Sequence, residues 1–408
     1  MQLFNVVSVE ETKKIIESNF NYMMGFENVN LSECTGRILY KDIISDINVP
    51  GFKRSTVDGY GVRSKDVFGA SESIQSILDL KGEVLMGHAP TCSIEFPGEC
   101  LYVPTGGMLP DGADSVVMIE YVDKLDEDTI LVNSPVAPGE NVINIGEDIK
   151  CGEIVLRGGT RLRPYEIGVL SSLGYSQIAV YQRPRVGIIS TGDEIVDQKD
   201  IPGPGQIRDI NSYLLFSSVI EDGGEPINYG FIKDDYDLLK HTAQKAVSEC
   251  DIVLISGGSS VGIKDQTLKV IESLGNPGVL VHGISVKPGK PTIIGKVSEK
   301  IVFGLPGHPL ACSVIYKAIV KYYMDKITSF KDIQYPVLCK FSMNYHKAKG
   351  REEYLPVKLQ MDGNEILAQP VFGKSGLITS FSKAWGYIRI DKNIEGLKEG
   401  QTVHVFKF

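Results

Sequence analysis

The segment DIVLISGGSSVGIKD, residues 251–265, joins a short apolar run to a glycine- and serine-rich turn that closes on an acid. A short apolar run bounded by a turn is typical of a fully buried strand. Glycines let the backbone approach a ligand closely, so the turn suits a phosphate. The segment contains neither GxxxxGK[ST] nor GxGxxG. It therefore predicts a phosphate-binding loop that is neither a P-loop nor a dinucleotide fingerprint.

Strands alternate with helices on both sides of this segment. RVGIIST (185–191), INYGFI (227–232) and KIVFGL (300–305) have the composition of further buried strands. The segments between these strands have apolar residues at helical spacing, and a long helix is expected over residues 308–327. This alternation predicts a mostly parallel sheet.

The remaining chain changes character in blocks. Short β-type runs with glycine and proline fill residues 46–140, and β-type runs return after residue 328. We therefore expect a multidomain α/β plus β protein with an inserted small β domain and a C-terminal β-barrel. The predicted boundaries are an elongated linker domain at 1–45 and 141–180, the inserted β domain at 46–140, the α/β domain at 181–328 and the barrel at 329–408.

In open α/β sheets, ligands bind beyond the carboxyl ends of the strands. The predicted strands are followed there by TGDE, KDD, GGSS and PGHP, and KPGKP precedes a further strand. The candidate ligand-binding residues in these loops are Ser256, Gly257, Gly258, Ser259, Lys287, Lys290, Pro306, Gly307, His308 and Pro309. Glu194, Asp234 and Asp265 are acids beside this predicted phosphate site, an arrangement that implies a divalent cation, Mg²⁺, between them.

Each loop alone is better explained as an ordinary turn than as a binding site. Asp235 and Asp265 suit helix N-caps, and His308 suits a capping position before Pro309. Several such loops converging on one edge of a sheet favour a binding site over independent turns.

Composition excludes several classes of protein. A chain of 408 residues is too long for a single hydrophobic core, so we expect several domains. The net charge of −9 argues against non-specific nucleic-acid binding. The seven cysteines form no CxxC pair, and the six histidines show no metal-ligand spacing. No apolar run has membrane-spanning length, and the N-terminus lacks a signal-peptide pattern, so we expect a cytoplasmic protein.

The inserted domain and the region after it add RSTVDGYGV (54–62), PTGGMLPDGADSVVM (104–118) and GEDI (146–149). With STGDEIV, GQIRDIN, SGGSSVG, KPGKP and LPGHP, they form an ordered set along nearly the whole chain. This set resembles the molybdopterin molybdenumtransferase family, the MoeA-type proteins and the gephyrin E domain.

The resemblance implies an enzyme that joins molybdate to adenylylated molybdopterin, releases AMP and requires Mg²⁺. It implies a homodimer whose active site lies between the α/β domain of one subunit and the inserted domain of the other. Contact with a molybdopterin adenylyltransferase is a further expectation. The family's functional positions correspond here to Asp58, Thr105, Asp148, Glu194, Asp234, Asp265, Lys287, Pro306 and Pro309.

Two alternatives remain at this point. A non-catalytic molybdopterin-binding or scaffold protein has the same fold, as the gephyrin relative illustrates. A pterin adenylyltransferase shares the α/β domain but lacks the VDGYGV and GEDI segments that this chain contains. The sequence therefore favours molybdenum insertion, without distinguishing molybdate from tungstate.

Overall fold

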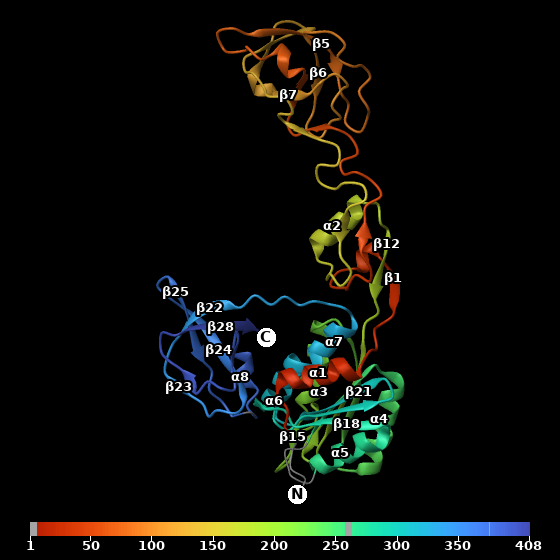
Figure 1. The fold of residues 1–408 in the computed structure, drawn as a ribbon, viewed down its shortest axis with the longest axis vertical. Helices are drawn as coiled ribbons and strands as arrows, with labels where there is room; N and C mark the ends of the chain where they lie inside the picture. The colour runs from red at the N-terminus through yellow and green to blue at the C-terminus, as the bar shows by residue number, and fades with distance from the viewer. Residues whose placement is uncertain (1–5, 258–262, 375) are drawn as a thin grey trace.

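The computed structural model describes residues 6–257, 263–374 and 376–408, apart from the side chains of residues 263–265 and 380. The α/β domain and the C-terminal domain lie side by side at one end of an elongated molecule, and the inserted β domain lies at the other (Figure 1). The chain runs to the inserted domain and back through a narrow linker region (Figure 1). This architecture confirms the predicted multidomain α/β plus β class.

The α/β domain is built on a six-stranded sheet whose first four strands are parallel. In sheet order the strands are β16 (Glu225–Ile232), β13 (Arg185–Thr191), β17 (Ile252–Gly257), β21 (Lys300–Pro306), β20 (Ile293–Val297) and β18 (Pro277–His282). β20 and β18 are antiparallel to their neighbours. The mostly parallel sheet predicted from the sequence is therefore present, with an antiparallel edge.

Helices cover both faces of this sheet, which explains why the central strand is buried along almost its whole length. Leu254 packs in one core with α1 (Val9–Asn19) and α3 (Asn211–Glu221). Val253 and Ile255 point to the other face, where α4 (Tyr236–Glu249) and α5 (Ile263–Leu274) complete the second core. The predicted long helix over 308–327 is present as three successive segments: α6 (Pro309–Ile315), the π-helical η4 (Tyr316–Val320) and α7 (Lys321–Ile327).

The inserted domain is a separate six-stranded sheet with its own apolar core, which includes Tyr60, Leu78 and Val117. Its strands, in sheet order, are β7 (Ser115–Met118), β4 (Gly59–Val62), β6 (Glu99–Val103), β5 (Ser76–Glu83), β9 (Thr129–Val132) and β8 (Val122–Lys124). Short 3-10 turns η2 (Ser64–Asp66) and η3 (Ile119–Tyr121) connect them.

Three small antiparallel pairs hold together the outgoing and returning chain of the linker region. They are β1 (Phe26–Asn30) with β12 (Gln177–Tyr181), β2 (Ile43–Ile44) with β11 (Ile154–Leu156), and β3 (Arg54–Ser55) with β10 (Val142–Ile143). The region also contains η1 (Leu31–Glu33) and α2 (Pro164–Ser172), which begins on a proline, a residue that suits the first helical position.

The C-terminal strands close into a barrel around an apolar core. The ring runs through β24 (Glu352–Asp362), β25 (Glu365–Pro370), β22 (Val337–Phe341), β28 (Thr402–Lys407) and β26 (Gly386–Ile390), which pairs again with β24. β19 (Val286–Lys287), from the α/β domain, adds to β24 in parallel. Among the described residues, no helix combines the length and apolarity needed to cross a membrane.

Candidate active site

The parallel register aligns three strand ends in one row. Thr191 of β13 lies opposite Gly257 of β17, and Gly257 lies opposite Pro306 of β21. β20 runs antiparallel to β21, with Ile293 opposite Gly304, so the segment that precedes β20 arrives at the same edge. TGDE, Gly257, PGHP and KPGKP therefore meet at one rim of the sheet, as the strand order requires.

Glycine is required at residue 257 because of this row. A Cβ there would lie 1.6 Å from the Thr191 hydroxyl oxygen and 2.7 Å from the Thr191 carbonyl oxygen. The strand can approach Thr191 this closely only if residue 257 has no side chain. Gly258 and Ser259 lie outside the described residues, and the same is true of the side chain of Asp265, which belongs to α5.

A cavity of about 270 Å³ opens at this rim. Five of the residues proposed from the sequence line it: Glu194, Gly257, Gly307, His308 and Pro309. The other lining residues are Thr191, Ile195, Ile207, Arg208, Asp209, Ile210, Asn211 and Gly376. Ile207 and Arg208 form β15 (Ile207–Arg208), which pairs with β14 (Ile195–Val196). Gly376 lies between β25 and β26 of the barrel, so the C-terminal domain contributes to the wall.

Three acids crowd beside the cavity. The Asp234 N–H donates to Asp193 Oδ1 at 3.1 Å, which brings the two residues together. Burial, followed by repulsion from Asp193 and Glu194, raises the pKa of Asp234. Asp234 Oδ1 is buried and has no hydrogen-bond partner in the described part of the chain. A cation would remove both penalties, since it neutralises the repulsion and occupies the free oxygen.

Not every polar residue of the rim faces the cavity. Ser256 is only 1 % exposed, and its hydroxyl lies 3.3 Å from that of Ser190. Ser190 is also bonded to Ser212 at 2.9 Å and to Asp209 at 3.1 Å. Ser256 thus belongs to a buried hydroxyl network beneath the strand ends, where it would act by fixing the rim.

Two cavity residues were not singled out from the sequence. Thr191 Oγ1 and Asn211 Oδ1 are buried and lack a hydrogen-bond partner among the described residues. Asn211 Nδ2 donates to the Gly307 carbonyl at 2.8 Å, so its amide links GQIRDIN to the PGHP turn. Buried polar atoms are rarely left without partners, so these two atoms mark the rim as incomplete without a ligand. Their position after a strand and at a helix start was the only signal available in the sequence.

For some residues of the rim, the structure supports a helix-capping role. Asp235 caps α4, with Oδ1 accepting from Leu238 N at 3.0 Å. His308 occupies the N-cap position of α6, and Pro309 its first turn. Both roles are structural, although His308 and Pro309 also line the cavity.

The lysine turn lies between the α/β domain and the barrel. Lys287 Nζ lies 2.9 Å from Glu353 Oε1 of β24. The Lys290 carbonyl accepts from the backbone N–H groups of Ile284 and Thr292, which fixes the turn, and its side chain is exposed.

The remaining predicted residues lie elsewhere in the chain. The Thr105 N–H donates to Asp58 Oδ1 at 2.8 Å, so these two sites adjoin in the inserted domain. Asp148 is exposed in the returning linker, where its N–H donates to the Val49 carbonyl at 3.1 Å. The inserted domain lies at the opposite end of the molecule from the α/β sheet (Figure 1). One chain therefore does not bring these residues to the rim.

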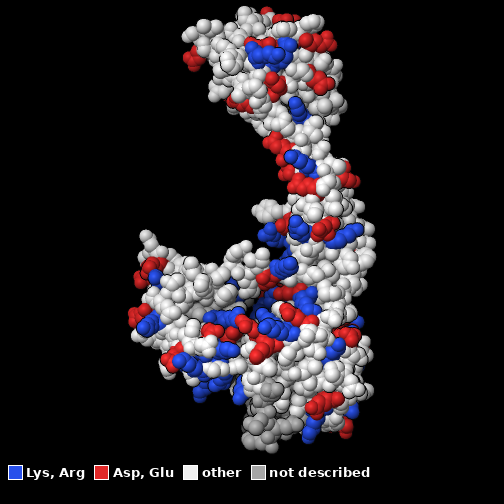
Figure 2. Space-filling view, in the orientation of Figure 1, with Lys and Arg blue, Asp and Glu red and all other residues white. Residues whose placement is uncertain are grey.

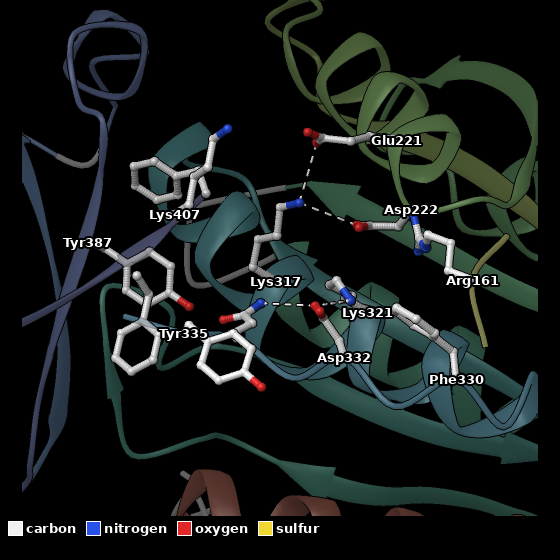
Figure 3. A pocket seen from close by; sticks show the side chains of 13 residues that line it. Arg161, Glu221, Asp222, Lys317, Lys321, Phe330, Asp332, Tyr335, Tyr387 and Lys407 are labelled. Carbon is white, nitrogen blue, oxygen red and sulfur yellow. Dashed lines mark hydrogen bonds and ion pairs between the residues drawn. The ribbon is translucent and has the colours of Figure 1, made fainter. Parts of the chain in front are cut away.

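A second cavity, of about 400 Å³, lies between helices of the α/β domain, the linker and the barrel. Figure 3 shows Lys317, Lys321 and Tyr387 around it, and Figure 2 shows mixed charges over this junction. Its charges pair with one another: Lys317 Nζ lies 3.4 Å from carboxylate oxygens of Glu221 and Asp222. These three residues all belong to the α/β domain, so this pairing holds the end of α3 against η4.

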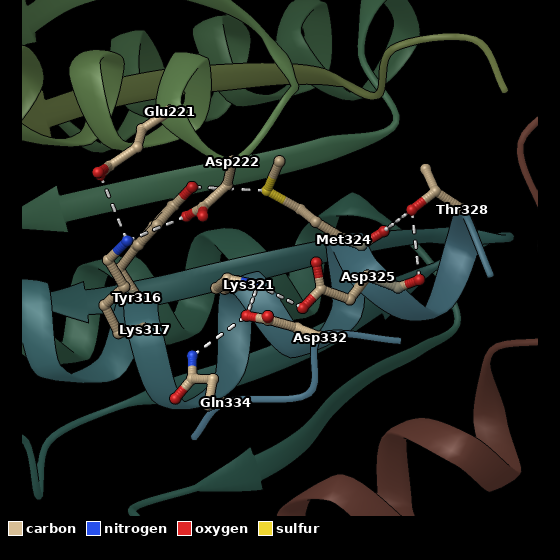
Figure 4. Close-up of polar contacts among 10 residues, drawn as sticks. All are labelled: Glu221, Asp222, Tyr316, Lys317, Lys321, Met324, Asp325, Thr328, Asp332 and Gln334. Carbon is tan, nitrogen blue, oxygen red and sulfur yellow. Dashed lines mark hydrogen bonds and ion pairs between the residues drawn. The ribbon is translucent and has the colours of Figure 1, made fainter. Parts of the chain in front are cut away.

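The pairing continues deeper in the same junction (Figure 4). Lys321 Nζ donates to Asp325 at 2.6 Å and lies 3.0 Å from Asp332. Burial raises the pKa of Asp325 to about 6, although Lys321 opposes the shift. Asp332 lies in the segment that leads to the barrel, so this cluster ties the two domains together.

Known families match the chain in the order of its domains. Residues 7–174 match the MoeA N-terminal region (domain I and II), residues 187–326 a probable molybdopterin binding domain, and residues 339–408 the MoeA C-terminal region (domain IV).

Similar proteins and structures cover nearly the whole chain. The molybdopterin molybdenumtransferase of Haemophilus influenzae is 33 % identical, over 94 % of each chain, and that of Bacillus subtilis is 30 % identical, over 93 % of this chain and 89 % of its own. Two structures of the molybdopterin biosynthesis MoeA protein of Pyrococcus horikoshii superpose with TM-scores of 0.82 and 0.87, at 39 % and 33 % identity, and each covers 99 % of this chain. They cover 99 % and 100 % of their own chains, respectively. Because three family regions match in order and the relatives align along nearly the whole chain, the chain belongs to the MoeA family.

Proposed function

We propose that this protein is a molybdopterin molybdenumtransferase that joins molybdate to the dithiolene of adenylylated molybdopterin and releases AMP. The observation that carries the proposal is the set of buried atoms without partners at the strand-end rim: Thr191 Oγ1, Asn211 Oδ1 and Asp234 Oδ1. Thr191 and Asn211 line a cavity bordered by glycines, an acid and a helix start. Asp234 lies near Glu194 of that lining, whose charge acts on it. A polar ligand with hydrogen-bonding groups on several sides would complete this set.

The acids of the rim fit a magnesium ion. Glu194 and Asp234 lie close enough for their charges to raise the pKa of Asp234, and carboxylate oxygens are preferred Mg²⁺ ligands. The described residues contain no group of three metal-ligating side chains, so Asp265 and substrate phosphates would have to supply further oxygens. When bound, the ion would neutralise charge on the pyrophosphate.

The glycine-serine loop and the lysine turn would hold the phosphate groups. Gly257 permits close backbone approach, and Gly258, Ser259 and Lys290 are proposed to donate to phosphate oxygens. Pro306 and Pro309 would fix the turn on either side of Gly307 and His308. Lys287 would contribute a further positive charge.

A second subunit would complete the site. Asp58, Thr105 and Asp148 lie away from the α/β rim of their own chain, so they reach a rim only in an assembly (Figure 1). In the proposed homodimer, the inserted domain of one protomer meets the rim of the other. Cytoplasmic location and contact with a molybdopterin adenylyltransferase belong to the same proposal.

Mixed dimers test this arrangement. Asp58→Asn and Asp234→Asn should each abolish turnover, but a heterodimer of the two keeps one intact composite site. Random mixing of equal amounts should restore about a quarter of wild-type activity, because half of the dimers are mixed and each has one working site. No recovery would contradict the shared site.

The reaction itself is tested with purified protein, adenylylated molybdopterin, molybdate and Mg²⁺. We expect AMP release and reconstitution of an apo-molybdoenzyme, both lost with EDTA and restored by Mg²⁺. Absence of AMP release from the wild-type protein would refute the proposed activity. Replacing molybdate by tungstate in the same assay identifies the preferred oxyanion.

A further inference from the structure

We propose that Glu353, a residue of the C-terminal barrel, is a positioning residue for Lys287 and sets how that lysine holds an oxyanion at the rim. The inference rests on the proposed function, because it takes the lysine turn to be part of the site. Through Glu353, the C-terminal barrel would influence the reaction itself, in addition to forming part of the cavity wall.

The backbone places the two residues together. β19 pairs in parallel with β24, and Lys287 lies opposite Glu353 in that register. The Ser285 hydroxyl donates to the Gly350 carbonyl at 2.6 Å, and the Glu352 N–H donates to the Ser285 carbonyl at 3.0 Å. The segment that leads into the lysine turn is therefore bonded to the barrel rather than merely adjacent to it.

The other side of the turn is fixed by packing. Gly289 has φ of +131°, and a Cβ there would lie 2.7 Å from Ile315 Cδ1 of α6. The turn is thus pressed against the helix that begins at His308 and Pro309. The backbone of the turn is held between this helix and the barrel, which fixes the position from which the Lys287 side chain extends.

The side chain of Glu353 needs a cation at this point. Glu353 is only 5 % exposed, and a buried carboxylate without a counterion is costly. Its Oε1 accepts from the Tyr345 hydroxyl at 2.9 Å and lies 2.9 Å from Lys287 Nζ. Its Oε2 is buried with no hydrogen-bond partner among the described residues. Tyr345 and the β-strand hold the carboxylate still, so the carboxylate can orient the lysine.

Lys287 differs from Glu353 in its exposure. Its side chain is 50 % exposed, against 7 % for that of Glu353. An ammonium has three donors, so the ion pair with Glu353 leaves donors for a tetrahedral oxyanion. That oxyanion is molybdate or a phosphate of the substrate. The negative Glu353 would also limit how tightly the anion binds, since like charges repel at this range.

The neighbouring residue Glu352 provides a matched control. It lies on the same strand and is also buried, but its Oε2 accepts from Arg389 at 3.0 Å instead of from the lysine turn. Glu353→Gln and Glu352→Gln therefore remove equivalent charges from one strand, and only the first releases Lys287. A purely structural role would make the two variants behave alike.

The test uses the full-length protein and measures equilibrium binding of molybdate alone and of AMP alone, together with turnover. For Glu353→Gln we expect about tenfold tighter binding of one anion, because the competing charge is gone. We also expect about tenfold lower kcat, because the lysine is no longer oriented. Glu352→Gln should match the wild type in both. Tighter molybdate binding assigns Lys287 to the metal oxyanion, and tighter AMP binding assigns it to the nucleotide phosphate.

Unchanged or weaker binding of both anions to Glu353→Gln would overturn the inference. If that variant does not fold, Tyr345→Phe removes one donor from the carboxylate and keeps its charge. It should lower kcat about threefold with anion binding unchanged, and wild-type kcat would then overturn the inference. The binding measurements need no turnover, so loss of AMP release in the wild type would refute the proposed function separately.

Discussion

The interdomain cavity and the strand-end rim both carry charged side chains, and they differ in whether those side chains are paired. At the interdomain junction, Lys317 and Lys321 each lie within 3.4 Å of two carboxylates. At the strand-end rim, Asp234 faces other acids, and Thr191 and Asn211 each leave a buried oxygen without a partner among the described residues. The lysines and carboxylates of the larger, interdomain cavity therefore neutralise one another, whereas the polar groups of the strand-end rim do not.

The difference shows that cavity size is a poor guide to function here. Paired charges at a domain contact hold two domains in register, whereas unpaired polar atoms cost stability and persist where a ligand completes them. Arg161 is the exception at the junction, because its Nε lacks a hydrogen-bond partner in the described part of the chain. Its guanidinium carbon instead lies 4.5 Å from the centre of the Phe330 ring.

The largest expected effect comes from Asp234→Asn at the rim. Loss of a proposed metal-ligating charge should lower turnover about 100- to 1,000-fold. The thermal unfolding midpoint should stay the same or rise, because the substitution relieves repulsion from Asp193 and Glu194. Asp222→Asn, at the junction, is the control and should keep wild-type turnover. Equal losses in the two variants would remove the distinction between the cavities.

The second effect is expected at the junction and concerns stability. Lys321→Met leaves Asp325 and Asp332 without their shared cation, and breaking a buried pair in this way costs about 3 kcal/mol. The unfolding midpoint measured by calorimetry should fall by roughly 6–12 °C. AMP release per folded molecule should remain within about twofold of the wild type. A large loss of turnover at an unchanged midpoint would assign this cavity a catalytic part.

Thr191→Val should raise stability and lower activity, and both changes should be smaller than those expected at Asp234 and Lys321. The substitution keeps the shape of the side chain and removes a buried hydroxyl without a partner, so we expect about 1 kcal/mol of added stability. If the hydroxyl bonds the substrate, kcat/KM should fall about tenfold. Higher stability with wild-type kinetics would show that Thr191 does not contact the ligand.

The smallest effect is a pH dependence at the junction. The pKa of Asp325 is about 6 in the folded protein against an ordinary 3.8, so the folded state holds this proton more tightly. Stability from this group is therefore full below pH 4 and is lost as the pH rises through 6. Asp325→Asn should reduce the fall in the free energy of unfolding between pH 4.5 and 6.5 by about 1–2 kcal/mol, measured by chemical denaturation at each pH. Glu221→Gln, at an exposed position, should leave the slope as it is in the wild type.

Much of the rim follows from the sequence because parallel strands impose it. Once β13, β17 and β21 are recognised as buried strands, Thr191, Gly257 and Pro306 must end at one edge. The closure of the C-terminal barrel also matched its pattern of short strands.

Other features depend on contacts that sequence spacing does not encode. The register of β19 on β24 brings Glu353 to Lys287 from another domain, and no local pattern reports it. Ser256 looked like a ligand residue but lies in a buried hydroxyl network. The bond from the Asn211 amide to the Gly307 carbonyl joins residues far apart in the sequence, and only the structure shows it.

The most direct test of the contrast between the cavities is a crystal structure of the full chain with AMP and Mg²⁺. We predict that the nucleotide lies at the strand-end rim, within hydrogen-bond distance of Thr191 or Asn211, with Mg²⁺ at Glu194 and Asp234. AMP bound instead beside Lys317 and Tyr387, with the rim unchanged, would contradict the account.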